Sequence, residues 1–116
     1  MWEICVNVKP LSYYSYLSHN KFRKYLTKSG RTYKEKLISM ITDYMIDKTM
    51  IEGNCKVEID FYFDNNRKND LDNFAKPILD AMSALVYCDD CQVVDLHLKK
   101  TVIEKTPHFV VRIEKL

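Results

Sequence analysis

Hydrophobic and polar residues alternate along four stretches of the chain, 2–8, 55–63, 92–102 and 108–114. Alternation with a period of two is typical of half-buried β-strands, because successive side chains point to opposite faces of the sheet. The pattern is clearest where every second residue is apolar: Cys55, Val57, Ile59, Phe61 and Phe63. A turn near Lys105-Thr106-Pro107 separates the last two stretches, which predicts a hairpin. The inward face of that hairpin is expected to carry Val94, Leu96, Leu98, Phe109, Val111 and Ile113.

Two further stretches, 32–48 and about 73–85, have apolar residues at the spacing of an amphipathic helix. Thr32 is a candidate N-cap for the first helix. Pro77 lies inside the second and lacks an N–H group, so that helix is expected to begin at Pro77 or to bend there. Residues 11–30 show no clear period and are expected to form a long basic loop.

The order strand, loop, helix, strand, helix, hairpin predicts a fold of the α+β class. We expect a mainly antiparallel or mixed sheet of about four strands, with two main helices on one face. With 116 residues, the chain is expected to form a single domain over 1–116.

The net charge of +2 conceals an uneven distribution, because residues 9–36 hold eight basic side chains and one acid. Five tyrosines are interleaved with them. Such a segment can lie along a nucleic-acid backbone, or it can be a solvated surface. No apolar run is long enough for a transmembrane helix, and residues 1–8 do not resemble a signal peptide, so we expect a cytoplasmic protein that binds no membrane.

Two acidic clusters carry the strongest chemical signal. The first is Asp70-Leu71-Asp72-Asn73 with Lys76 just beyond, and the second is Asp89-Asp90-Cys91-Gln92. Several carboxylates brought together are the ligands that a hard cation such as magnesium prefers, and a nearby lysine can offset charge on a phosphate. Taken singly, Asp70 or Asp72 is more simply a helix cap, and Lys76 with Asp80 a surface ion pair.

A helix from 73 to 85 is about 20 Å long, which puts Asp72 and Asp90 at opposite ends of it. The residues after Leu85 reach back about 16 Å when extended. The site is therefore closed either within one subunit or by a partner subunit.

The pair Cys88 and Cys91 offers a competing hypothesis, a small zinc or redox protein. A structural zinc site needs four ligands, and no second pair has matching spacing. The absence of a glycine-rich phosphate loop argues against an NTPase.

The acidic motifs resemble those of the RusA family of Holliday junction resolvases. The resemblance rests on Asp70-Leu71-Asp72-Asn73-Phe74-Ala75-Lys76, on Asp80-Ala81-Met82 and on Asp89-Asp90-Cys91-Gln92-Val93-Val94. It extends to the N-terminal part, where Pro10-Leu11-Ser12, His19-Asn20-Lys21 and Gly30 are similar. The resemblance implies a RusA-like fold and a homodimer that binds four-way DNA junctions. It also implies paired symmetric nicks that require magnesium or manganese.

The resulting hypothesis is a magnesium-dependent endodeoxyribonuclease that resolves Holliday junctions in DNA recombination and repair. By the resemblance, Asp70, Asp72 and Asp90 are its catalytic acids and metal ligands, and Lys76 is its catalytic lysine. The expected DNA contacts are Ser12, Tyr13, Tyr14, Ser15, Lys21, Arg23, Lys24, Arg67, Lys68, Asn69 and Asn73. A DNA-junction-binding protein without catalytic activity is the alternative.

Overall fold

A computed structural model describes residues 1–13, 17–19, 24–66, 69–103 and 105–116, with only the backbone of 17–19 and 24. The secondary structure in chain order is β1 (Trp2–Val6), β2 (Leu17–His19), β3 (Lys24–Leu26), α2 (Lys28–Tyr44), β4 (Cys55–Phe63), α3 (Leu71–Met82), the 3-10 turn η1 (Asp90–Gln92), β5 (Val93–Val102) and β6 (His108–Lys115). Among these described elements, no helix is both long and apolar enough to cross a membrane.

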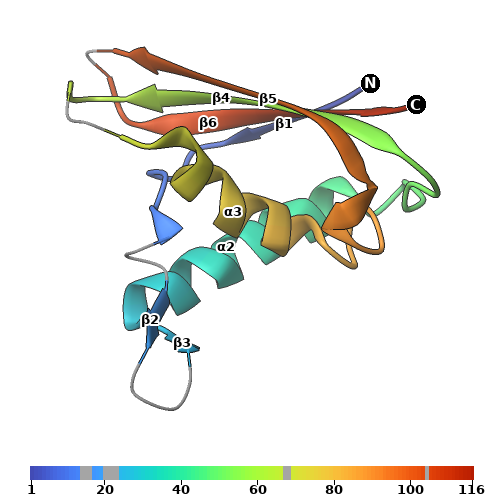
Figure 1. Cartoon of the computed structure of the whole chain (residues 1–116), viewed down its shortest axis with the longest axis horizontal. Helices are drawn as coiled ribbons and strands as arrows, with labels where there is room; N and C mark the ends of the chain where they lie inside the picture. Colours follow the sequence, from blue (N-terminus) through green and yellow to red (C-terminus); the bar gives the residue numbers. More distant parts are fainter. Residues whose placement is uncertain (14–16, 20–23, 67–68, 104) are drawn as a thin grey trace.

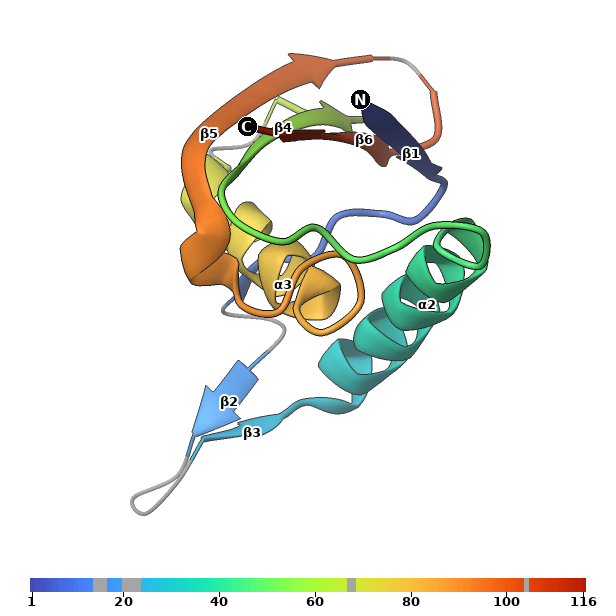
Figure 2. The same ribbon diagram turned by 90° about the vertical axis from the view of Figure 1, so that its right-hand side faces the viewer.

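Four strands form a mixed sheet in the order β1-β6-β4-β5. Strand β6 pairs antiparallel with β1 and with β4, whereas β5 pairs parallel with β4. Helices α2 and α3 lie side by side on one face of this sheet (Figures 1 and 2). The α+β class, the four-stranded sheet and the two main helices are therefore confirmed.

The predicted hairpin of the last two strands is wrong, because β4 lies between β5 and β6. Alternation fixes which residues share a face, but it does not fix which strands are neighbours. Of the predicted inward residues, Phe109, Val111 and Ile113 are buried. On the edge strand β5, however, Val94 and Leu96 are 57% and 41% exposed, because the helices do not cover them.

The core forms where the helices meet strand β4, whose residues are buried at every second position. Phe61 is fully buried and contacts the rings of Phe63, Phe74 and Phe109, with centroids 5.9 to 6.1 Å apart. Each such side chain stabilises the fold by about 1.5–3 kcal/mol through its removal from water. Because Phe74 belongs to α3, this packing fixes the helix that carries the first acidic cluster.

The described residues of segment 11–30 include regular secondary structure, where a loop was expected. Strands β2 and β3 pair antiparallel and extend away from the sheet (Figures 1 and 2). Helix α2 then begins at Lys28, with Thr27 rather than Thr32 as its N-cap: the Thr27 hydroxyl accepts a hydrogen bond from the Gly30 amide at 2.9 Å. Thr27, five residues before Thr32, gives the same local signal, so the sequence alone does not distinguish the two caps.

Helix α3 runs through Pro77 without a break and ends earlier than predicted, at Met82. Pro77 is buried, so its ring contributes to packing, which offsets the hydrogen bond that it cannot donate. After the helix, Ala84 adopts a left-handed backbone with φ of 69°. After this turn the chain runs back along α3, where the Tyr87 hydroxyl meets the Leu79 carbonyl.

Candidate active site

The second acidic cluster forms a short turn in which the two aspartates have different tasks. Asp89 is the N-cap of η1, and its carboxylate accepts a hydrogen bond from the Cys91 amide at 3.0 Å. That bond lowers the pKa of Asp89, because it favours the charged form of the carboxyl group. Asp89 therefore shapes the turn, which leaves the next residue, Asp90, to face helix α3.

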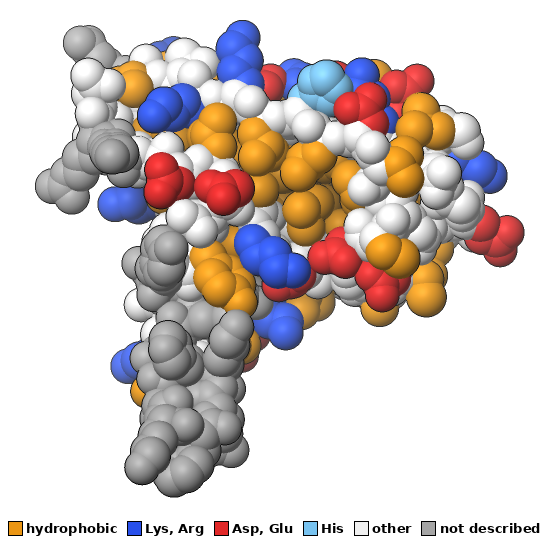
Figure 3. Space-filling model, viewed as in Figure 1, with side chains coloured by type: hydrophobic (Ala, Val, Ile, Leu, Met, Phe, Trp, Pro, Cys, Tyr) orange, Lys and Arg blue, Asp and Glu red, His pale blue; other side chains and the backbone are white. Residues whose placement is uncertain are grey.

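Asp90 lies against the cationic end of Lys76, with its Oδ2 3.5 Å from Nζ. The same ammonium group is 3.1 Å from Oδ1 of Asp80, one helical turn further along α3. The expected Lys76–Asp80 ion pair is thus confirmed, and Asp90 joins it from outside the helix. In the view of Figure 3, hydrophobic side chains gather between α3 and β5, and acidic and basic side chains lie below them.

The two aspartates determine the charge state of Lys76. The hydrogen bond from Lys76 to Asp80 raises the pKa of Lys76, and the negative charge of Asp90 adds to this effect. The side chain is about half exposed, so it remains accessible to a ligand. Lys76 is therefore a cation at neutral pH, suited to stabilising negative charge and unsuited to acting as a base.

One subunit is sufficient to bring Asp90 to Lys76. Because α3 ends at Met82, the return path is shorter than a helix to Leu85 would require. The position of η1 is fixed behind the site by Tyr87, which is fully buried and donates a hydrogen bond to the Leu79 carbonyl at 2.9 Å. The question left open by the sequence concerns Asp72 and Asp90, and the contact of Asp90 with Lys76 does not answer it.

The first acidic cluster is more open. Asp70 occupies the N-cap position of α3, yet its side chain makes no capping hydrogen bond among the described residues. Its Oδ2 accepts one long hydrogen bond, of 3.5 Å, from the side-chain Nδ2 of Asn73. Asp70 and Asp72 are both exposed at the start of the helix, where the macrodipole favours negative charge. Capping by the side chain therefore does not explain Asp70.

The donors fit a hard cation by their chemistry, since all three predicted ligands are carboxylates. In the described part of the chain, however, no three His, Cys, Asp or Glu side chains are grouped closely enough to hold a metal ion. Asp72, Lys76 and Asp80 follow one another at intervals of four, which puts them on one face of α3. Asp90 meets that face, but it is not clustered with Asp70 and Asp72.

Few of the predicted DNA contacts can be placed. Ser12, Tyr13, Asn69 and Asn73 are half-buried, and the Asn69 carbonyl lies 3.5 Å from Nζ of Lys100. For Lys24, only the backbone, in β3, is described. The remaining predicted contacts lie outside the described residues: Tyr14, Ser15, Lys21, Arg23, Arg67 and Lys68.

The sequence reasoning did not single out a cavity of about 400 Å³ at the start of α2. Lys9, Lys28 and Lys36 line it together with Ser29 and Thr32, and no carboxylate among the described residues does. Lys28 and Lys36 are eight residues apart, a spacing that puts them on one face of a helix. The spacing of these two lysines is visible in the sequence, but a helix that starts at Thr32 does not include Lys28.

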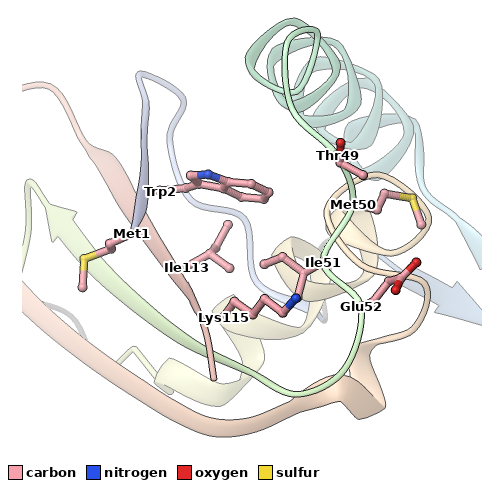
Figure 4. A pocket seen from close by; sticks show the side chains of 8 residues that line it. All are labelled: Met1, Trp2, Thr49, Met50, Ile51, Glu52, Ile113 and Lys115. Atoms are coloured by element: carbon pink, nitrogen blue, oxygen red, sulfur yellow. The ribbon is translucent and has the colours of Figure 1, made fainter.

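A second cavity, of about 450 Å³, is formed without residues of either acidic cluster (Figure 4). It is lined by residues from the start of β1, the end of β6 and the connection before β4, among them Trp2, Glu52 and Lys115. None of the predicted site residues contributes to it. This cavity therefore has no part in the candidate site.

The cysteine hypothesis finds no support in the geometry. All four cysteines are free thiols. The negative charge of Asp89 is the main reason why the pKa of Cys91 is raised, with Asp90 adding to it. A raised pKa disfavours the thiolate, which is the form that binds metals and attacks disulfides.

Comparison with known proteins identifies the family. The family model "Endodeoxyribonuclease RusA" matches residues 9–114. The crossover junction endodeoxyribonucleases RusA of Shigella sonnei (strain Ss046) and of Escherichia coli (strain K12) are each 31% identical to this chain over 97 residues, which is 83% of the chain and 80% of each relative. The corresponding protein of Enterobacteria phage 82 has the same identity and coverage. This chain, whose acidic site places Asp90 against Lys76, therefore belongs by these matches to the RusA family of endodeoxyribonucleases.

Proposed function

We propose that this protein is a magnesium-dependent endodeoxyribonuclease that resolves four-way DNA junctions by paired symmetric nicks. One observation carries the proposal: Asp90 faces Lys76 on the same side of α3 that presents Asp72. Family membership and the names of the relatives support junctions as the substrate. We infer that the protein acts in DNA recombination and repair in the cytoplasm.

The carboxylates of Asp70, Asp72 and Asp90 are proposed to hold magnesium, or manganese in its place. When bound, the metal supplies a more acidic water and stabilises the leaving oxygen. Lys76 approaches a non-bridging phosphate oxygen and stabilises the charge that grows there in the transition state. For this, Lys76 must exchange part of its contact with Asp80 and Asp90 for the phosphate.

The DNA backbone is proposed to contact the predicted residues of the N-terminal segment together with Lys9, Lys28 and Lys36. These lysines make no ion pair with any carboxylate among the described residues, so their charge is available to phosphates. Each phosphate neutralised makes binding more dependent on salt. A variant that lacks all three lysines is therefore expected to bind junctions with a less steep dependence on salt concentration.

Paired nicks on a symmetric substrate suit a symmetric homodimer, which we also propose. The outer edge of β5 carries exposed hydrophobic residues, including Val94, Leu96 and Val102, that a second subunit could cover. Sedimentation velocity at micromolar concentration tests the stoichiometry. A monomer both alone and on junction DNA contradicts the dimer.

The decisive experiment is cleavage of a synthetic four-way junction, with and without magnesium, beside a linear duplex of the same sequence. We expect paired symmetric nicks in the junction that need the metal, while the duplex stays intact. Junction binding without cutting, in magnesium and manganese alike, would instead establish a binding protein without catalytic activity.

A further inference from the structure

The side chain of Gln92 uses its whole hydrogen-bonding capacity next to the proposed site. Its Oε1 accepts hydrogen bonds from the amides of Cys88, at 2.8 Å, and Asp89, at 3.1 Å. Its Nε2 donates to the carbonyls of Ile51, at 3.0 Å, and Gly53, at 2.8 Å. Two donors on one side and two acceptors on the other admit a single orientation of the amide.

These bonds join two parts of the chain that are about forty residues apart. One is the turn that carries Asp90, and the other is the segment between α2 and β4. That second segment is itself firmly placed: Ile51 is buried, and its amide donates to the Val86 carbonyl at 2.8 Å. Gly53 has φ of +83°, a backbone conformation that disfavours residues with a side chain, so the position of its carbonyl depends on glycine.

Asp90 is therefore held from both sides in sequence. On one side, the Asp89 carboxylate accepts a hydrogen bond from the Cys91 amide, and the Asp89 amide donates to Oε1 of Gln92. On the other side, Gln92 is fixed against the Ile51–Gly53 segment. The backbone before and after Asp90 is thus held in place, and from it the Asp90 carboxylate reaches to 3.5 Å from Nζ of Lys76.

We infer that Gln92 is a positioning residue, which sets the direction of Asp90 without touching the DNA itself. This inference rests on the proposed function, because it assigns Gln92 a role at that same site. If Gln92 only stabilised the fold, its loss would lower stability, DNA binding and cleavage rate together. A positioning role predicts a loss of cleavage rate alone. Three of the four hydrogen bonds are solvent-exposed, so water can replace them and little stability is lost. Misdirection of Asp90, in contrast, affects the chemical step.

Two substitutions separate the two halves of the bond network. Gln92→Leu replaces the amide by a shorter apolar side chain and removes all of the bonds. Gln92→Glu can still accept from Cys88 and Asp89, but it cannot donate to the carbonyls of Ile51 and Gly53 when ionised. The matched control is Tyr44→Phe, which removes a hydrogen bond from the Glu3 amide at 3.0 Å, also between distant parts of the chain.

Single-turnover cleavage of a junction and the Kd for the same junction are measured for all variants, with thermal unfolding as the test of folding. We expect Gln92→Leu to cut at least tenfold more slowly with a Kd within twofold of the wild type. The cleavage rate of Gln92→Glu is expected to lie between those of Gln92→Leu and the wild type. Tyr44→Phe is expected to cut at the wild-type rate. A folded Gln92→Leu variant that cuts at the wild-type rate overturns the inference, as does a parallel loss of rate and binding.

Amide hydrogen exchange of the wild-type protein gives a test that needs neither activity nor a variant. The Cys88 and Asp89 amides are expected to exchange at least tenfold more slowly than the amide of another exposed residue outside secondary structure, Glu52. Equally fast exchange overturns the inference. If these amides are protected but the wild type does not cut junctions, the proposed function is wrong, while Gln92 still fixes the turn that carries Asp90.

Discussion

The two acidic clusters differ in how firmly the fold holds their carboxylates. Around Asp90, the Asp89 carboxylate accepts from the Cys91 amide and Gln92 donates to the Ile51 carbonyl, which fixes the backbone, while the side chain of Asp90 forms an ion pair with Lys76. At the start of α3, Asp70 has only a weak contact with Asn73, and Asp72 is exposed. One carboxylate is preorganised, and the other two are open to solvent.

This difference indicates how such a site can bind a charged ligand. A fixed carboxylate beside a cation costs little to organise at the moment of reaction. Two exposed carboxylates at a helix start are free to turn toward an arriving cation, at the cost of the side-chain entropy that is then lost. We therefore expect Asp90 to define the geometry and Asp70 with Asp72 to complete it. The predictions that follow test this division, from the largest expected effect to the smallest.

Replacement of either kind of carboxylate should abolish cutting if both clusters belong to one site. We expect Asp90→Asn and Asp70→Asn each to reduce the rate of junction cleavage by about 10³-fold, because each removes a charged ligand. Junction binding, measured by gel shift, should remain within about threefold, which corresponds to only ~0.6 kcal/mol. Asp43→Asn on α2 is the control. Normal cutting by Asp70→Asn would restrict the site to the second cluster.

Removal of the cation between the clusters should have the next largest effect. Lys76→Gln is expected to lower the single-turnover rate by about 10²-fold, as is usual when one group that stabilises transition-state charge is lost. Lys76→Arg keeps the charge and should retain part of the rate. The control Lys34→Gln, elsewhere on the surface, should cut at the wild-type rate. An unchanged rate for Lys76→Gln would show that the lysine only neutralises Asp80 and Asp90.

Stability of the preorganised cluster should depend on Tyr87. Tyr87→Phe removes the hydrogen bond to the Leu79 carbonyl, and we expect it to lower the free energy of unfolding by about 1–1.5 kcal/mol. Chemical denaturation at pH 7 measures this difference. A cost near zero would mean that the hydroxyl does not hold η1 against α3.

The same tyrosine predicts a dependence on alkaline pH. Burial raises the pKa of Tyr87 well above its ordinary value of 10.0, so folding favours the neutral hydroxyl. Its contribution is therefore complete below about pH 10 and is lost above it, by up to ~1.4 kcal/mol per pH unit. Denaturation between pH 9 and about pH 11 should show a steeper fall for the wild type than for Tyr87→Phe. Parallel curves would contradict the assignment.

The smallest effect is expected for Asp80. Its ion pair with Lys76 is partly exposed and spans one helical turn, an arrangement that contributes about 0.3–0.5 kcal/mol. Asp80→Asn should therefore change the cleavage rate by less than about threefold, because Asp90 still holds the lysine. A tenfold loss of cleavage rate would show that Asp80, as well as Asp90, is needed to hold Lys76 in place. The preorganised part of the site would then include Asp80.

The sequence by itself determined much of the local structure. The alternation from Cys55 to Phe63 gave the central strand, and the apolar spacing after Asp72 gave α3. The choice of Asp90 over Asp89 came from the family resemblance and stays a prediction; in the structure, Asp90 is the one that lies against Lys76, and Asp89 caps η1. These features follow from side-chain periodicity and short motifs, which are properties of neighbouring residues.

Only the tertiary structure decided the pairing of strands and the route back to the site. Alternation in β5 looks the same whether its neighbour is β4 or β6, so the predicted hairpin was wrong. The contact between Asp90 and Lys76 depends on where α3 ends and on the hydrogen bonds of Gln92 with Ile51 and Gly53. Such contacts join residues far apart in the chain, and they form only when burial of the whole core makes up for the lost chain entropy.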